Sequence, residues 1–134
     1  MSIKIRSAKN KGMRFQKWVC EKIAKLFNVP FNNQDEQCEI HSRECGLSGT
    51  DIVLRGEIYK KFPFDIETKN TESFNVYKAI AQAQVNTAPG RHWLLFHKKN
   101  RSLPIVILDA DLFFKILANT KDLYLGLKNT TNER

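Results

Sequence analysis

The sequence predicts a single α/β domain in which helices flank a central β-sheet. Three features predict it: an amphipathic helical pattern ahead of residue 28, two short apolar runs that carry acidic residues, and a second helical pattern after them. A chain of 134 residues is long enough for one domain with its own core. We expect this domain to span residues 12–118, between a mobile basic N-terminal arm at 1–11 and a C-terminal tail at 119–134.

The first helix is predicted over residues 12–27, and Asn28-Val29-Pro30 ends its pattern. The side chains expected to face the core at helical spacing are Phe15, Val19, Ile23 and Leu26. Gln16 lies beside this stripe at about 100° per residue, whereas Glu21 falls on the opposite side. Gln16 is therefore the better placed to reach a functional site, with an ordinary boundary amide as the alternative.

Three strands are predicted next, over residues 38–43, 51–54 and 64–69. The turn Gly46-Leu47-Ser48-Gly49 separates the first two strands. Its glycines matter because the backbone must bend sharply there to bring Asp51 to the sheet.

Acidic and basic side chains share one face of the third strand. Side chains alternate along a strand, so Glu67 and Lys69 project together. Asp51 on the neighbouring strand would add a second carboxylate, and two carboxylates, waters and a substrate phosphate are a usual set for Mg²⁺. Asp65 shares this face but is expected nearer the start of the strand. The pattern indicates a metal-dependent phosphodiesterase.

The second helix is predicted over residues 74–86. Its inward stripe consists of Val76, Ala79, Ile80 and Ala83. Gln82 and Asn86 are four residues apart and share one flank of this helix. Gln82, and less favourably Gln84 on the other flank, could reach a phosphate or a metal-bound water, with a plain surface position as the alternative for both.

Two further strands are predicted at residues 93–97 and 105–108, joined by a hairpin with a basic tip. A last helix is predicted to start at residues 109–111. Its aromatic residues and two in the tail are candidates for a dimer face or for the core of the monomer: Phe113, Phe114, Tyr124 and Leu125.

The charge of the chain favours a polyanionic partner. Lys and Arg number 22 against 14 Asp and Glu, a formal net charge of +8, and nucleic acid is the partner that best suits such an excess. Basic residues near the N-terminus and at the hairpin tip are predicted to follow a DNA backbone: Lys9, Lys11, Arg14, Lys17, Lys98, Lys99 and Arg101.

The cysteines and the hydropathy suggest a reducing cytosol. Three cysteines, an odd number, and no apolar signal segment do not favour a disulfide framework. No segment has the length and apolarity to cross a bilayer, so no membrane is predicted as a partner. A zinc site is a minor alternative; its candidate ligands are Cys38, His41 and Cys45 with His92 or His97.

The order of helix, strand, acid-bearing strand, Glu-x-Lys strand and helix resembles the PD-(D/E)XK nuclease superfamily. Asp51 matches its first strand acid, and Glu67-Thr68-Lys69 matches its signature. Over about residues 9–118 the chain is similar to small phage-type nucleases described as Holliday junction resolvases, and more distantly to archaeal resolvases. Gln16 stands where archaeal resolvases carry a metal-site Glu, and Thr50 stands where the superfamily name has Pro.

The resemblance implies a restriction-endonuclease-like fold with a central mixed sheet. It also implies a homodimeric, Mg²⁺- or Mn²⁺-dependent DNA endonuclease that acts on branched DNA in phage recombination or processing, in the host cytoplasm. In that scheme Asp51, Glu67 and the Thr68 carbonyl hold the metal and Lys69 orients the attacking water. Gln16 and Gln82 position water or phosphate oxygens.

Two alternatives remain at this point. A non-catalytic DNA-binding protein that assists recombination would share the fold and the basic charge. It would gain nothing from Asp51 and Glu67, because without a cation these carboxylates repel phosphate. The second alternative is a structural ion pair in which Glu67 and Lys69 face solvent.

Overall fold

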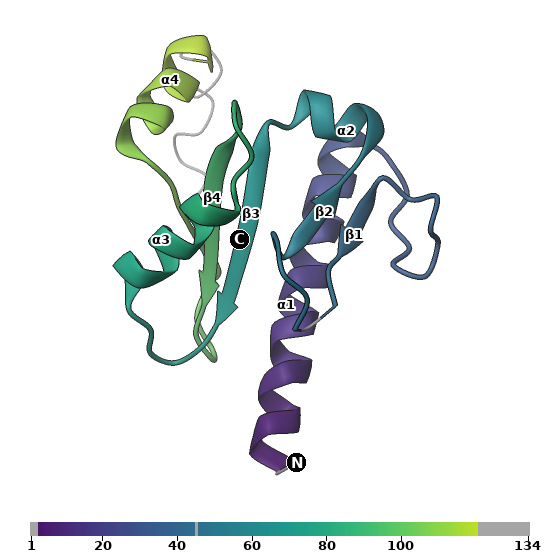
Figure 1. The fold of residues 1–134 in the computed structure, drawn as a ribbon, viewed down its shortest axis with the longest axis vertical. Helices are drawn as coiled ribbons and strands as arrows, with labels where there is room; N and C mark the ends of the chain where they lie inside the picture. The colour runs from purple at the N-terminus through teal and green to yellow at the C-terminus, as the bar shows by residue number, and fades with distance from the viewer. Residues whose placement is uncertain (1–2, 45, 121–134) are drawn as a thin grey trace, which may run out of the picture.

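Helix α1 (Ile3–Phe27) runs along the length of the domain in the computed structural model, which describes residues 3–44 and 46–120 (Figure 1). The helix begins at Ile3 rather than at Gly12, so the segment expected as a mobile basic arm is its first part. The expected start was wrong because apolar periodicity appears only where a helix packs. Residues 7–10 are exposed, and their Ser, Ala, Lys and Asn side chains need no apolar stripe to remain helical.

The buried stripe of α1 is close to the predicted one. It consists of Phe15, Val19, Cys20, Ile23 and Ala24. Leu26, which was expected in the stripe, is 68% exposed. A helical turn takes 3.6 residues, so residues spaced three or four apart share a face of the helix only approximately. After Ile23 it is therefore Phe27, four residues on, that packs against the core, and not Leu26.

Strands β1 (Ile40–Ser42) and β2 (Ile52–Leu54) form an antiparallel pair and are shorter than predicted. The turn between them contains Gly46 at φ 91° and Gly49 at φ 108°. Both values lie in the region that favours glycine, so the expected need for a sharp bend is confirmed.

Strands β3 (Phe64–Asn70), β4 (His92–Lys98) and β5 (Ile105–Ile107) form a mixed sheet in that order. β3 and β4 are parallel, with α3 (Val76–Asn86) as their crossover, and β5 is antiparallel to β4. The expected mixed sheet is confirmed, but the strands form two sheets instead of one. β1 and β2 are too short to extend the ladder, and a 3.1 Å hydrogen bond from Asp51 N to Ile66 O links them to β3.

Two further helices complete the described part of the chain. α2 (Gly56–Lys61) was not predicted, because one buried side chain, Ile58, gives no periodic pattern. α4 (Ala110–Thr120) begins where expected, and the Asp109 carboxylate accepts from Leu112 N at 3.0 Å. Predictions for residues 121–134, including Tyr124 and Leu125, lie outside the described residues.

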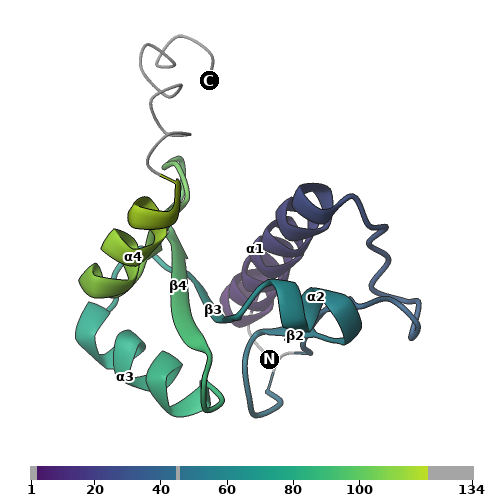
Figure 2. The same cartoon turned by 90° about the horizontal axis from the view of Figure 1, so that it is seen from above.

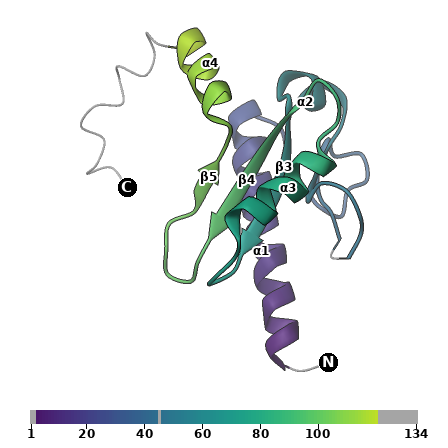
Figure 3. The same ribbon diagram turned by 60° about the vertical axis from the view of Figure 1, so that its left-hand side comes forward.

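The elements form three layers. α1 covers one face of the sheet and α3 covers the other, as the view from above shows (Figure 2). β5 lies beyond β4, on the side away from β3 (Figure 3). The core lies between α1 and the strands; its aliphatic members include Val19, Ile23, Ile40, Ile52, Ile66 and Leu94. This arrangement leaves the polar face of β3 turned toward α3.

Cys20 and Cys38 are free and buried, and burial raises the pKa of the Cys20 thiol to about 12. Cys45, the third proposed zinc ligand, lies outside the described residues.

Within residues 3–44 and 46–120, no helix combines the length and apolarity that a membrane span requires.

Candidate active site

Asp51 joins the two sheets through both its backbone and its side chain. Its amide donates to Ile66 O, and its Oδ2 accepts from Thr68 N at 2.7 Å and from Thr68 Oγ1 at 3.3 Å. Residues 66 and 68 present their polar backbone groups to the same edge of β3, which is the edge beside β2. The Asp51 carboxylate is therefore held against β3 at the position where Glu67 and Thr68 lie.

Glu67 is almost completely buried, with 2% of its surface exposed. Its Oε1 accepts from Asn86 Nδ2 at 2.9 Å, and the same amide group donates to Gly49 O at 3.4 Å. Asn86 thus ties the last residue of α3 to β3 and to the turn before Asp51. The sequence predicts that Asn86 and Gln82 share one flank of the helix. It does not predict the contact between Asn86 and Glu67, because that contact depends on how α3 packs against the sheet.

The environment of Glu67 disfavours its charged form. The surroundings of Glu67 together raise its pKa from 4.5 to about 7, with burial as the largest cause and the charge of Asp51 acting in the same direction. The Asn86 hydrogen bond and the charge of Lys69 act in the opposite direction. Two carboxylates this close together repel each other, and a cation between them would remove that repulsion.

Asn86→Ala is expected to raise the pKa of Glu67 above its value of about 7, because the hydrogen bond that favours the carboxylate is lost. Carboxyl ¹³C chemical shifts followed against pH measure this change. Gln84→Ala, at an exposed position of the same helix, is the control and should leave the titration unchanged. An unshifted Glu67 titration in Asn86→Ala would contradict the assigned contact.

Lys69 and Gln82 lie on opposite walls of one pocket of about 210 Å³ between β3 and α3. Gln82 thus lies near Lys69, and its expected contact with a phosphate or a metal-bound water stays a prediction. Gln16 takes a different position: its Oε1 accepts from Ser42 Oγ at 2.7 Å. Ser42 pairs with Ile52, the residue after Asp51, so Gln16 is attached to the strand pair beside the acids. Within the described residues, no hydrogen bond joins Gln16 to either acid.

Asp65 belongs to a separate, structural cluster. Its Oδ1 pairs with Arg91 Nε at 2.8 Å, and its Oδ2 accepts from Ala88 N at 2.9 Å. The guanidinium also donates to the carbonyls of Tyr59, Phe62 and Phe64. The expected position of Asp65 near the start of the strand is confirmed.

Asp65→Asn is expected to lower the free energy of unfolding by about 2 kcal/mol, because a mostly buried Arg91 loses its counter-charge. Chemical denaturation measures the change. Glu57→Gln, which alters an exposed ion pair with Lys60, is the control and should cost less than about 1 kcal/mol. If Asp65→Asn lowers the free energy of unfolding as little as the control does, the Asp65 cluster does not stabilise the domain.

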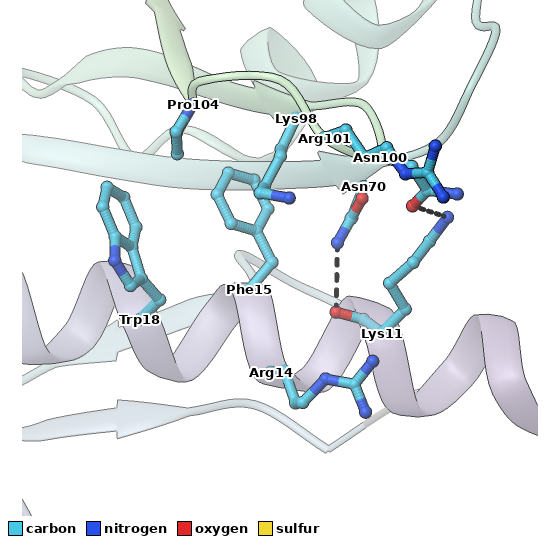
Figure 4. Close-up of a pocket in the computed structure, with 9 residues that line it drawn as sticks. All are labelled: Lys11, Arg14, Phe15, Trp18, Asn70, Lys98, Asn100, Arg101 and Pro104. Atoms are coloured by element: carbon cyan, nitrogen blue, oxygen red, sulfur yellow. Dashed lines mark hydrogen bonds between the residues drawn. The ribbon is translucent and has the colours of Figure 1, made fainter.

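Four of the seven basic residues predicted to contact DNA line one pocket of about 500 Å³ between α1 and the turn after β4 (Figure 4). They are Lys11, Arg14, Lys98 and Arg101. The Lys11 ammonium donates to Asn100 Oδ1 at 3.0 Å, which ties the helix to the turn. The other three, Lys9, Lys17 and Lys99, are exposed outside this pocket.

The donor set at the acids suits a hard cation that keeps most of its waters. Within residues 3–44 and 46–120, no three His, Cys, Asp or Glu side chains gather into a metal-binding group. Asp51 and Glu67 supply two carboxylates, and the Thr68 carbonyl faces the same edge as the Thr68 amide that binds Asp51. Mg²⁺ is commonly held by one or two carboxylates with water and substrate phosphate, so the residues fit that ion and do not fit a closed zinc site.

No protein-family model matches the chain, and comparisons with curated proteins and with solved structures find no significant match.

Proposed function

We propose that this protein is a metal-dependent DNA endonuclease of the PD-(D/E)XK type with a restriction-endonuclease-like fold. One observation carries the proposal: Asp51, directly before β2, and Glu67 of β3 lie together where the two sheets adjoin, next to Lys69. A buried carboxylate beside a second carboxylate costs stability in the metal-free protein. A site that holds a cation gives this arrangement a purpose, whereas a module that only binds DNA does not need it.

Asp51, Glu67 and the Thr68 carbonyl would hold Mg²⁺ or Mn²⁺. When bound, such an ion polarises the scissile phosphate and lowers the pKa of a coordinated water. Thr68 N–H keeps the Asp51 carboxylate turned toward β3, and Asn86 does the same for Glu67 from the other side. The protein thus orients both carboxylates before any ligand arrives, which limits the reorganisation needed during the reaction.

Lys69 is the residue that acts on the reacting atoms. Its side chain projects from the Glu67 face of β3 and lines the pocket that it shares with Gln82. There Lys69 Nζ would donate to the attacking water and offset the negative charge that develops on the phosphate oxygens. Gln82 would hold a phosphate oxygen or that water. Gln16 would act through Ser42 as a positioning residue for the β1–β2 pair.

The substrate proposed is DNA, with branched DNA such as a four-way junction as the preferred form. The net charge of +8 supports a polyanion, and the cations of the pocket on α1 supply phosphate contacts. Two symmetric cuts at a junction require two active sites, so a homodimer belongs to the proposal. Phe113 and Phe114 of α4 are 44% and 66% exposed, which supports their use in such a contact.

The test is cleavage of labelled four-way junction, flap and linear duplex DNA in Mg²⁺, in Mn²⁺ and in EDTA. The protein should cut in either metal and not in EDTA, and Lys69→Ala should lose most of the rate. Lys60→Ala removes the same charge from an exposed position on α2 and should keep it. Paired cuts at symmetric positions would establish junction resolution. DNA binding without cleavage in any metal would overturn the proposal in favour of a recombination-accessory DNA-binding protein.

A further inference from the structure

The pocket between α1 and the turn after β4 contains an aromatic surface as well as cations. The rings of Phe15 and Trp18 lie side by side, with centroids 5.9 Å apart and planes 22° apart (Figure 4). Phe15 is buried, whereas Trp18 is 37% exposed. A partly exposed indole beside a buried ring is a flat surface on which another ring can stack.

The charged side chains that line the pocket all have the same sign. The pocket residues include four cations, Lys11, Arg14, Lys98 and Arg101, and none of the described residues lining it is acidic. A fifth cation, Lys22, lies 5.3 Å from the centre of the Trp18 ring. Flat apolar surface together with several cations matches a nucleotide, which has a flat base and an anionic phosphate.

The backbone of Arg101, which lines the pocket, is strained. Its φ of 59° lies in the left-handed region, where a side chain costs about 1–2 kcal/mol. Glycine would occupy this turn position without that cost, and Arg101 places its guanidinium at the pocket instead. Strain of this kind is found where a particular side chain is needed for function.

The pocket lies close to the candidate active site along the chain. Asn70 lines it and directly follows Lys69, and the two side chains project from opposite faces of β3. The pocket and the candidate active site thus lie at the same end of β3, on its two faces. The volume of about 500 Å³ falls within the range of roughly 300–1,000 Å³ typical of small-molecule sites.

We propose that this pocket binds an unpaired nucleotide of a DNA strand, with the base stacked on Trp18 and the phosphates held by the surrounding cations. A base within a duplex has both faces covered by its neighbours and cannot stack there. The biological role of the pocket rests on the proposed function. The substrate class would be DNA with unpaired nucleotides next to the cleaved strand, as at a flap or a splayed branch.

The test uses Trp18 itself as the reporter. The chain has two tryptophans, so Trp93→Phe leaves Trp18 as the only indole. In EDTA, an oligothymidylate should quench Trp18 fluorescence and bind at least about fivefold more tightly than an abasic oligonucleotide of the same length. Equal affinities, or binding without quenching, would overturn the inference.

A pocket variant checks the role of the ring. Trp18→Leu should bind the oligothymidylate and the abasic strand equally well, while Trp93→Phe alone should keep the preference. If Trp18→Leu does not fold, the quenching measurement still decides, because it needs no change in the pocket. Both measurements are made without metal, so they are independent of cleavage. Base-dependent binding by a protein that never cuts DNA would leave the pocket assigned and the nuclease proposal overturned, and cleavage without base-dependent binding would do the reverse.

Discussion

Asp51→Asn is expected to reduce metal-dependent DNA cleavage by about 10³-fold while DNA binding in EDTA stays unchanged. Such a loss corresponds to about 4 kcal/mol of transition-state stabilisation, which is the scale of a metal contribution. The neutral amide loses the charge that attracts the cation. Its oxygen can still accept from Thr68 N–H, so the link between the two sheets is kept. Single-turnover cleavage rates measure the effect.

Two further observations separate a catalytic defect from a folding defect. Asp111→Asn, an exposed position in the first turn of α4, is the control and should cleave at the unaltered rate. In Asp51→Asn the pKa of Glu67 should fall below about 7, because the neighbouring negative charge that raises it is gone. Undiminished cleavage by Asp51→Asn would remove this residue from the site.

Glu67→Gln is expected to abolish cleavage and at the same time to stabilise the metal-free protein at about pH 8 by about 2 kcal/mol. The pKa of Glu67 is raised from 4.5 to about 7 on folding, so between these values the folded state binds more protons than the unfolded state. The free energy of unfolding therefore falls as the pH rises through this window, by up to about 3 kcal/mol from this group. Glutamine stays neutral and avoids that loss, and its oxygen can still accept from Asn86.

Urea unfolding at a series of pH values measures this prediction. The difference between Glu67→Gln and the unsubstituted protein should vanish at acidic pH and grow toward about pH 8. Mg²⁺ should raise the unfolding temperature of the unsubstituted protein at that pH and should have little effect on Glu67→Gln. A variant less stable than the unsubstituted protein at about pH 8 would contradict the assigned electrostatics of the site.

Local sequence patterns predicted most of the elements but few of the contacts between them. The strands bearing Asp51 and Glu67-Thr68-Lys69 and the helix bearing Gln82 were predicted because alternation and helical periodicity are local signals. The division into two sheets was missed because it depends on how far β1 and β2 extend beside β3. The start of α1 was placed too late because an exposed helical segment carries no apolar stripe.

In the candidate site too, the sequence predicted individual residues better than the contacts between elements. Asp51, Glu67 and Lys69 could be named from their spacing, whereas the role of Asn86 depends on the crossover that brings the end of α3 to β3. In the sequence, Trp18 is simply one of the apolar residues that recur at helical spacing in the first helix. Its place in one pocket with four cations depends on residues far apart in the chain, which no local pattern reports.

The early start of α1 has a consequence for how stability is distributed in the molecule. Residues 7–10 are helical yet exposed, and the start of the helix extends beyond the strands (Figure 1). A helical turn without tertiary packing is held only by its own hydrogen bonds and opens locally at little cost in free energy. Its amide protons should therefore exchange with solvent much faster than those of the packed turns around Val19. Contact with a polyanion would slow that exchange without any change in the global unfolding of the domain.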